Sequence, residues 1–416
     1  MKSLAIIALS LAVLANTNAL AAALPDAPGL LPTAIARTLL EQDPSVVAAR
    51  AGLEAAQLDA DMLDASPYEW TARLSTQRRK VQSESNYREW NAGIERGVRL
   101  PGKAAADRQL GKAVLAEAQA RYGEALHEAA RELFTLWLHW IGAEQARDLA
   151  SSNRQSIQDN LAIVEKRLRA GDVARLDLHL AQAELAEQKR LENDTKTQAL
   201  IAWAHLQTRF PGFDAHFNSL PTPLPLTEEA VFWRERILAE SDELKITQAQ
   251  FDKAQAHAER FRAEKMPDPS IGMYTASEAG GRERITGISI SMPIPVLGGI
   301  RSGRASKSTY LADMTRQEVE LKRRQISGEI AASFASAQGN YESLQISMEG
   351  ANAMQANAKL TQRAYALGET ELQVLLAARR QATGATQSAL AARMAAISAY
   401  YLLLIDAHLV WDLEHE

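Results

Sequence analysis

Cysteine is absent from the 416 residues, so neither disulfide bonds nor cysteine metal ligands stabilise the fold, and no lipid-modified cysteine is expected as an anchor. Long apolar runs are scarce beyond the N-terminus. The best, from Ala395 to Ile405, is shorter than the roughly 18 residues that a spanning helix needs. The net charge is only −5, with no basic stretch typical of nucleic-acid binding. Any membrane crossing is therefore expected to use β-strands.

The N-terminus has the pattern of a secretory signal. Met1-Lys2-Ser3 precedes an apolar run from Leu4 to Leu14, and the small residues Ala21-Ala22-Ala23 follow. This pattern predicts a signal peptide over residues 1–23, whereas the alternative is a buried N-terminal helix. We therefore expect the protein to be exported from the cytoplasm.

The rest of the chain is a tandem repeat. Gly102 corresponds to Gly299 and Gly171 to Gly368, so that both landmarks are offset by 197 residues. The two glycines of each repeat are 69 residues apart, with no gap between the copies. This duplication predicts repeat 1 over residues 24–210 and repeat 2 over 227–416, joined by a proline-containing linker over 211–226.

The segment between the two glycines of each repeat is expected to be one long helix. Both copies lack proline from the residue after the first glycine onward and are rich in Ala, Glu, Gln, Arg and Leu. A helix of this length spans on the order of 100 Å. Leu126, Leu133 and Trp140 are spaced by seven, which is typical of a coiled-coil seam. Shorter helices are expected near residues 33–65, 172–209, 228–264 and 372–410.

Each repeat also contains two segments in which apolar and polar residues alternate, as in β-strands. These strands are expected at about 68–80, 88–100, 269–278 and 284–293. About ten residues is the length of a tilted membrane strand. Four strands cannot close a barrel, and an open sheet edge is not tolerated in lipid, so several copies would have to share one barrel. The alternative is a small soluble sheet on a helical protein.

With this order of elements given twice, the chain resembles the outer membrane efflux proteins, the TolC-like outer membrane factors. The features that carry the resemblance are the Leu100-Pro101-Gly102-Lys103 and Leu297-Gly298-Gly299-Ile300 junctions and the two glycine tips. The resemblance covers residues 32–410. The form of the junctions is similar to the branch of the family that exports heavy-metal cations.

The resemblance implies a mainly α protein with membrane β-structure, in which three chains share a 12-stranded β-barrel and a long α-helical coiled-coil barrel. The homotrimer would lie in outer-membrane lipid with a periplasmic helical extension. Its tips would meet a periplasmic adaptor, the membrane fusion protein, which is bound to an inner-membrane pump. The tip residues implied in that contact are Arg167, Arg169, Gly171, Asp172, Gly368 and Glu369.

The resemblance also implies acidic residues at the mouth of the tunnel, for which Asp177 and Glu371 are the candidates. Asp177 has Val374 as its counterpart in the second repeat, so a simpler interpretation is a carboxylate that starts a helix. The basic residues around the first tip have two interpretations, an adaptor contact or helix capping. Trp70 and Trp90 fall on the expected strands and suit a membrane-interface belt.

No constellation of residues indicates an enzyme, a cofactor or a metal centre. The segment Gly97 to Ala104 resembles a phosphate-binding loop but has Ala104 where a Ser or Thr should follow Lys103. His127-Glu128 begins like a zinc-protease motif but has Arg131 in place of the second histidine. We therefore do not expect catalysis.

The sequence favours a passive outer-membrane exit duct of a tripartite efflux system, working with a pump of the RND type and exporting heavy-metal cations. The alternatives are a multidrug or type I secretion duct of the same fold, or a periplasmic coiled-coil adaptor or scaffold. The residues do not identify the cargo, because selectivity in such systems lies mainly in the pump.

Overall fold

A computed structural model describes residues 29–84, 86–294 and 299–411. The expected signal peptide and its cleavage site lie outside the described residues. So do the first two residues of the second junction, Leu297 and Gly298.

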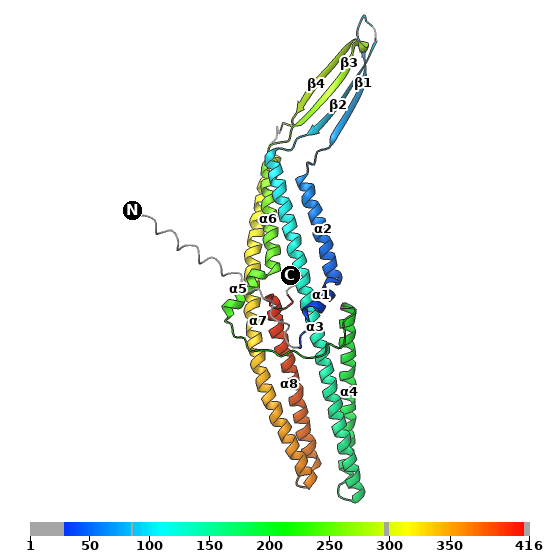
Figure 1. The fold of residues 1–416 in the computed structure, drawn as a ribbon, viewed down its shortest axis with the longest axis vertical. Coiled ribbons are helices and arrows are strands. Elements are labelled where there is room, and N and C mark those ends of the chain that lie inside the picture. The colour runs from blue at the N-terminus through cyan, green and yellow to red at the C-terminus, as the bar shows by residue number, and fades with distance from the viewer. Residues whose placement is uncertain (1–28, 85, 295–298, 412–416) are drawn as a thin grey trace, which may run out of the picture. The chain divides into compact units, whose positions relative to one another are not determined.

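The first repeat contains four helices and two strands in the expected order (Figure 1). They are α1 (Thr33–Glu41), α2 (Pro44–Asp64), β1 (Trp70–Lys80), β2 (Asn86–Gly97), α3 (Pro101–Ala170) and α4 (Arg175–Arg209). The α3 helix is 70 residues long and begins with proline, whose fixed φ suits the first helical position.

The second repeat has the same order, with a short 3-10 turn between its strands. Its elements are α5 (Ala230–Glu240), α6 (Asp242–Ala263), β3 (Ser270–Glu278), η1 (Ala279–Gly281), β4 (Glu283–Ser291), α7 (Gly299–Leu367) and α8 (Leu372–Asp406). The α7 helix has 69 residues, so the long helices of the two repeats are almost equal in length.

The first helical segment of each repeat is broken, and the expectation of one continuous helix over 33–65 and another over 228–264 is wrong. In the first repeat Pro44 starts α2, because proline lacks the N–H that would continue α1. In the second repeat Ser241 is the N-cap of α6, and its hydroxyl accepts a hydrogen bond from the Leu244 N–H at 3.3 Å.

The coiled-coil seam of α3 is buried as its spacing predicts. Leu126, Leu133 and Trp140 are all buried, and so are Ile157 and Val164 further along the helix. The spacing of seven holds within each of these two groups, and in the middle of the helix Phe134, Trp137, Leu138 and Ile141 are buried as well, so that part of α3 is enclosed on more than one side. Packing rather than helix propensity therefore holds this helix in place.

The four strands form one antiparallel sheet in the order β1-β2-β3-β4 (Figure 1). β2 pairs with β3, so the central pair of the sheet joins the two repeats. Only one side of β1 and of β4 is paired with a described strand, which leaves two open edges. The strands match the expected segments within about three residues at each end, as is usual for element boundaries.

By its internal contacts the chain divides into two compact units, and the long helices α3 and α7 each contribute to both. One unit contains the sheet with residues 44–125 and 241–327. The other contains the described parts of residues 1–43, 126–240 and 328–416. Its core is built around Phe134, Trp137, Ile397 and Leu403, which are almost fully buried.

The linker over residues 211–226 contains no helix or strand, as its prolines predict. It is nevertheless attached to the core of its unit. The Trp137 indole donates a hydrogen bond to the Phe217 carbonyl at 2.8 Å, and the Tyr401 hydroxyl donates one to the Thr222 carbonyl at 3.4 Å. These bonds give the indole N–H and the tyrosine hydroxyl the hydrogen-bond partners that such groups need when they are buried.

Candidate functional site

The two helical hairpins end in the same backbone motif. Gly171 follows α3 with a φ of 82°, and Gly368 follows α7 with a φ of 78°, a conformation that glycine adopts without strain. The N–H of Asp172 bonds the Arg167 carbonyl at 2.9 Å, and the N–H of Glu369 bonds the Ala364 carbonyl at 2.9 Å. Each tip is therefore a Schellman motif that satisfies the last carbonyls of its helix.

Each tip places an exposed carboxylate directly after its glycine, namely Asp172 and Glu369. An apolar residue commonly occupies this position, where it packs back onto the helix. The exposed acid in both repeats leaves each tip with a charged end. The adaptor contact predicted for the tip residues stays a prediction.

The residues expected at the tunnel mouth lie at the starts of the returning helices. The Asp177 carboxylate accepts a hydrogen bond from the Ala174 N–H at 3.3 Å in the first turn of α4. A negative charge there also complements the positive end of the helix dipole. Glu371 is the exposed N-cap residue of α8 and makes no side-chain capping bond. Asp177 thus has a structural task, and the gate role of both residues stays a prediction.

Near their ends the two hairpins are packed together by an apolar cluster from α3, α4, α7 and α8. The buried members are Ile157, Val164, Ala181, Leu185, Tyr365, Leu372, Leu375 and Leu376. This cluster brings the two hairpin ends of the repeats to one place, although they are 197 residues apart in the chain. The tips can therefore act as one surface.

Arg167 joins the two hairpins. Its guanidinium lies over the Tyr365 ring, 5.0 Å from the centroid, and Nη1 donates a hydrogen bond to the Tyr365 carbonyl at 3.5 Å. A cation–π contact of this kind contributes about 1 kcal/mol. Arg169, by contrast, is exposed. Of the two arginines predicted to contact an adaptor, only Arg169 extends freely from the tip.

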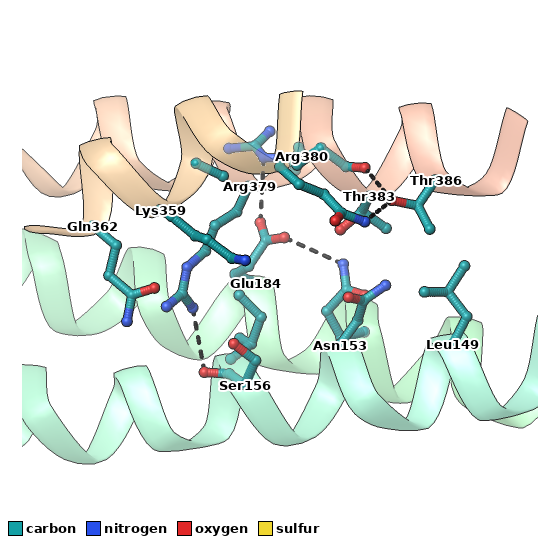
Figure 2. Close-up of a pocket in the computed structure, with 15 residues that line it drawn as sticks. Leu149, Asn153, Ser156, Glu184, Lys359, Gln362, Arg379, Arg380, Thr383 and Thr386 are labelled. Atoms are coloured by element: carbon teal, nitrogen blue, oxygen red, sulfur yellow. Dashed lines mark hydrogen bonds and ion pairs between the residues drawn. The ribbon is translucent and has the colours of Figure 1, made fainter. Parts of the chain in front are cut away.

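Farther from the tips than this cluster, the same four helices line a polar groove of about 290 Å³ (Figure 2). Arg380 lies 3.5 Å from Glu184, and Arg379 donates a hydrogen bond to the Ser156 carbonyl at 3.2 Å. Burial lowers the pKa of Arg379. With Lys359, the groove has three cations and only Glu184 as a carboxylate among its lining residues, so it does not suit a metal cation.

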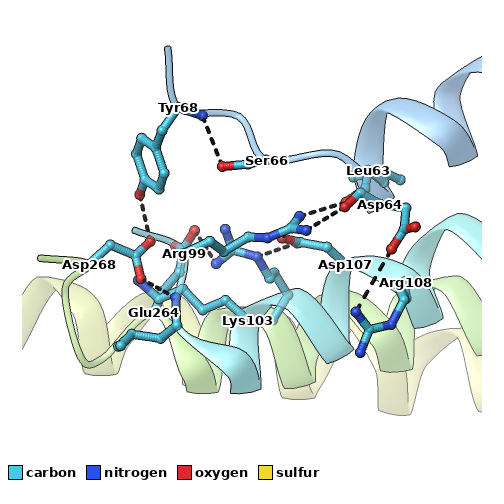
Figure 3. Close-up of polar contacts among 12 residues, drawn as sticks. Leu63, Asp64, Ser66, Tyr68, Arg99, Lys103, Asp107, Arg108, Glu264 and Asp268 are labelled. Atoms are coloured by element: carbon cyan, nitrogen blue, oxygen red, sulfur yellow. Dashed lines mark hydrogen bonds and ion pairs between the residues drawn. The ribbon is translucent and has the colours of Figure 1, made fainter. Parts of the chain in front are cut away.

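The strands meet the helices at a junction built on buried charges (Figure 3). Lys103 is paired with Asp268 at 3.0 Å, and both side chains are buried. Asp268 also accepts hydrogen bonds from the Tyr68 hydroxyl at 2.5 Å and the Leu100 N–H at 3.0 Å. Burial raises the pKa of Asp268, but the Tyr68, Leu100 and Lys103 contacts outweigh it and hold that pKa below its usual range.

The junction explains the sequence that resembles a phosphate-binding loop. Lys103, which would contact the phosphates, is buried against a carboxylate. Arg99 is held by Asp107 at 3.1 Å and by the Leu63 carbonyl at 2.7 Å (Figure 3). The glycine and lysine of this segment therefore form a strand-to-helix connection and not a nucleotide site.

The two faces of the sheet differ in chemistry. Because side chains alternate along strands, the pairing register assigns every strand residue to a face. One side, here called the apolar face, consists of Trp70, Ala72, Leu74, Thr76, Arg78 and Lys80 of β1, Asn86, Arg88, Trp90, Ala92, Ile94 and Arg96 of β2, Ile271, Met273, Thr275 and Ser277 of β3, and Arg284, Thr286, Ile288 and Ile290 of β4. The apolar face carries no Asp or Glu.

The opposite side, here called the polar face, carries all four strand carboxylates: Glu89, Glu95, Glu278 and Glu283. Two of them form ion pairs on that face, Glu95 with Arg73 at 2.7 Å and Glu89 with Arg79 at 2.9 Å. On the apolar face Leu74 is 74% exposed, although it is a large aliphatic side chain. An exposed apolar surface of this extent indicates contact with lipid or another protein.

A family model decides the identity of the chain. The model described as "Outer membrane efflux protein" matches residues 35–209 and 233–403. The chain belongs to the outer membrane efflux protein family. It is therefore an outer-membrane efflux channel, with its helical part on the periplasmic side, and a passive channel rather than an enzyme.

Solved structures with the same fold include other outer-membrane channels. The outer-membrane channel OprN is 20% identical, with a TM-score of 0.75, covering 92% of this chain and 91% of its own. The Campylobacter jejuni CmeC outer membrane channel is 14% identical, with a TM-score of 0.73 and coverages of 93% and 86%. The outer membrane protein VceC of Vibrio cholerae is 16% identical, with a TM-score of 0.72 and coverages of 90% and 96%. No curated protein matched the chain.

In this efflux protein the two predicted interface tryptophans lie on the same face of the sheet. Trp70 is 64% exposed and begins β1, near the helices, whereas Trp90 is 43% exposed and lies toward the hairpin loops. The Arg96 guanidinium lies over the Trp70 ring at 5.7 Å. Both tryptophans thus border the exposed aliphatic part of the apolar face, and their place at a membrane interface stays a prediction.

Among the described residues one helix, α8, is long and apolar enough to cross a membrane by length and composition alone. Its buried residues include Leu375, Ile397, Tyr401 and Leu404, which pack within the helical unit. A helix that contributes to a core passes the same test, and this packing gives α8 a place in the helical part of the channel.

Several functional contacts were not found from the sequence. Tyr365 contacts Arg167. The counterpart of Tyr365 in the first repeat is Leu168, and this difference between the repeats was the one sequence signal that pointed to the contact. Asp268 organises the strand-to-helix junction, and its partner Lys103 is 165 residues away in the chain. No local pattern links residues so far apart.

Proposed function

We propose that this channel is a homotrimer in which three copies of the sheet close one 12-stranded barrel. The observation that carries the proposal is the four-stranded sheet with an apolar face, a polar face and open edges on β1 and β4. In lipid the N–H and C=O groups of an open edge have no water to bond, so each edge needs a strand from another copy. The apolar face would then meet lipid, and the polar face would line the lumen.

The dimensions support this arrangement. β1 has 11 residues, or about 36 Å at 3.3 Å per residue, and a tilt near 40° reduces its height to about 28 Å. That height matches a barrel's apolar band of about 25 Å with its interface girdles. The α3 and α7 helices would continue from this barrel as a periplasmic tunnel wall.

The hairpin ends would dock a periplasmic adaptor that is bound to an inner-membrane pump of the RND type. Support comes from the two Schellman tips with exposed acids and from the apolar cluster that holds them together. Arg169, Asp172 and Glu369 are the tip side chains available for this contact. We propose repeat 1 over residues 24–210, the linker over 211–226 and repeat 2 over 227–416 as the units of this architecture, after a signal peptide over 1–23.

We propose heavy-metal cations as the cargo, because the Pro101-Gly102-Lys103 and Gly298-Gly299-Ile300 junctions are similar to those of the branch of the family that exports heavy-metal cations. A multidrug or type I secretion duct of the same fold is the alternative. A deletion strain that becomes sensitive to metal salts but not to dyes and antibiotics supports metal export. The opposite pattern of sensitivity supports drug export and contradicts the metal assignment.

The channel itself is tested on the purified full-length protein. We expect trimers that resist dissociation by detergent at room temperature and separate into monomers on heating. We also expect stepwise ion conductance in planar bilayers. A monomer that inserts no conducting unit would contradict the proposal. The periplasmic scaffold considered from the sequence is set aside, because the family model covers both repeats.

A further inference from the structure

The cations of the apolar face gather at its two ends. Arg96 lies at the end next to the helices, where it is near Trp70. At the opposite end, near the hairpin loops, the face carries four exposed cations, here called the basic rim: Arg78, Lys80, Arg88 and Arg284. Between these ends the face is aliphatic, aromatic or small and polar. The basic rim therefore borders the part of the sheet that is suited to lipid.

The basic rim contains an unfavourable pair. Arg78 lies directly opposite Arg88 in the register of β1 and β2, and like charges at such positions repel and destabilise a sheet. Within the described part of the chain, no ion pair or hydrogen bond engages either side chain. On the polar face Glu278 lies opposite Glu283 in the same way. All four strand carboxylates lie on the polar face, so no strand carboxylate neutralises the cations of the basic rim.

The location of the basic rim suggests what neutralises it. The helices extend on the periplasmic side, so the hairpin loops lie at the outer surface of the membrane. Trp90, which suits the membrane interface, is two residues from Arg88 on β2 and lies on the same face. The rim side chains would therefore lie at the depth of the headgroups in the outer leaflet.

We propose that the basic rim binds the phosphate groups of the phosphorylated glycolipid in the outer leaflet. This inference rests on the proposed function, because it requires the strands to span the membrane. Arginine binds phosphate through parallel N–H donors, which makes it the favoured residue for this contact. The acyl chains of the same lipid would lie over Leu74, Ile94 and Ile288. A free anion could not make this second contact, so the surface fits a lipid.

The test compares binding of lipids to the purified full-length trimer by native mass spectrometry. The probes are a bisphosphorylated lipid A and the same glycolipid after removal of both phosphates. We expect wild-type protein to retain the phosphorylated form preferentially. Because a basic residue near an anionic leaflet contributes about fivefold in affinity, the R78Q/R88Q variant should bind it about thirtyfold more weakly. Arg284→Gln alone should reduce binding about fivefold.

The matched control is Arg73→Gln, which removes a cation from the same strand on the polar face. It should leave glycolipid binding unchanged. Equal binding of the two glycolipids to wild-type protein would overturn the inference, and so would equal losses in the control and in R78Q/R88Q. Conductance of the same preparations distinguishes failure of this inference from failure of the proposed function. A conducting trimer without preference for the phosphorylated glycolipid refutes only the lipid-binding role of the basic rim. A protein that forms no conducting trimer refutes the proposed function.

Discussion

Two arginines near the tip of the first hairpin, Arg167 and Arg169, have different roles. Arg167 and Arg169 are two residues apart on the last turn of α3, yet only Arg167 lies on the Tyr365 ring. Arg167 therefore contributes to the contact between the two hairpins, and Arg169 contributes to the charge of the tip. Their substitutions separate the two roles.

We expect Arg167→Ala to increase the open fraction of the channel about fivefold, because it removes a contact of about 1 kcal/mol between the hairpins. Arg169→Ala should leave the open fraction unchanged. Single-channel recordings in planar bilayers measure both. Tyr365→Phe serves as a control, since it keeps the ring and removes a hydroxyl that has no partner among the described residues. Equal open fractions of Arg167→Ala, Arg169→Ala and Tyr365→Phe would show that the contact does not restrain the tips.

For the sheet, the alternation of its two faces leads to a prediction about the proposed barrel. Leu74 lies on the apolar face and its neighbour Ser75 on the polar face. We expect Leu74→Lys to destabilise the trimer by about 2 to 4 kcal/mol, the effect of a lysine facing the middle of a bilayer. Ser75→Lys should be tolerated. Heat dissociation of the trimers followed on gels measures both, and similar losses from the two changes would contradict the assigned faces.

The junction between strands and helices makes a second prediction. Removing the charge of Asp268 leaves Lys103 buried without a partner, so Asp268→Asn should lower the free energy of unfolding by about 3 kcal/mol at neutral pH. The double variant Lys103→Met with Asp268→Asn should recover part of that loss. Thermal unfolding followed by circular dichroism measures these changes. Full additivity of the two substitutions would contradict the pairing.

The contribution of Asp268 depends on pH in a defined direction. The pKa of Asp268 is lower in the folded protein than in the unfolded chain, where it is about 3.9. Its stabilisation is therefore complete above pH 4 to 5 and is lost as the pH falls through the folded pKa. The stability difference between wild type and Asp268→Asn should shrink below pH 4, and a constant difference down to pH 2 would contradict this assignment.

Most elements could be predicted from the sequence, because the repeat places them twice and their periodicities are strong. The breaks between α1 and α2 and between α5 and α6 could not. Asp43, in the first break, is buried and forms an ion pair with Arg209, which is 166 residues away. A break of this kind is stabilised by a tertiary contact, for which Pro44 alone was an insufficient signal. The tips could be located through Gly171 and Gly368, but the Arg167–Tyr365 contact depends on packing between repeats.

At the scale of the whole molecule, the near equality of α3 and α7 has a physical reason. Each helix contributes to both compact units and connects the sheet to a hairpin tip. In a tunnel wall built from both repeats, a helix longer by one turn would place its tip about 5 Å beyond the other. The apolar cluster at the hairpin ends requires both tips at one level, which accounts for the equal spacing seen in the sequence.

The open edges of β1 and β4 have a consequence for the life of the chain before it reaches the membrane. In water an exposed edge beside a surface such as Leu74, Ile288 and Ile290 is a template for aggregation. These edges must therefore be kept from pairing with other chains until the strands reach their partners in the barrel. In the proposed trimer, assembly would then compete with aggregation in the periplasm, and the yield of functional channels would depend on how quickly three chains meet at the membrane.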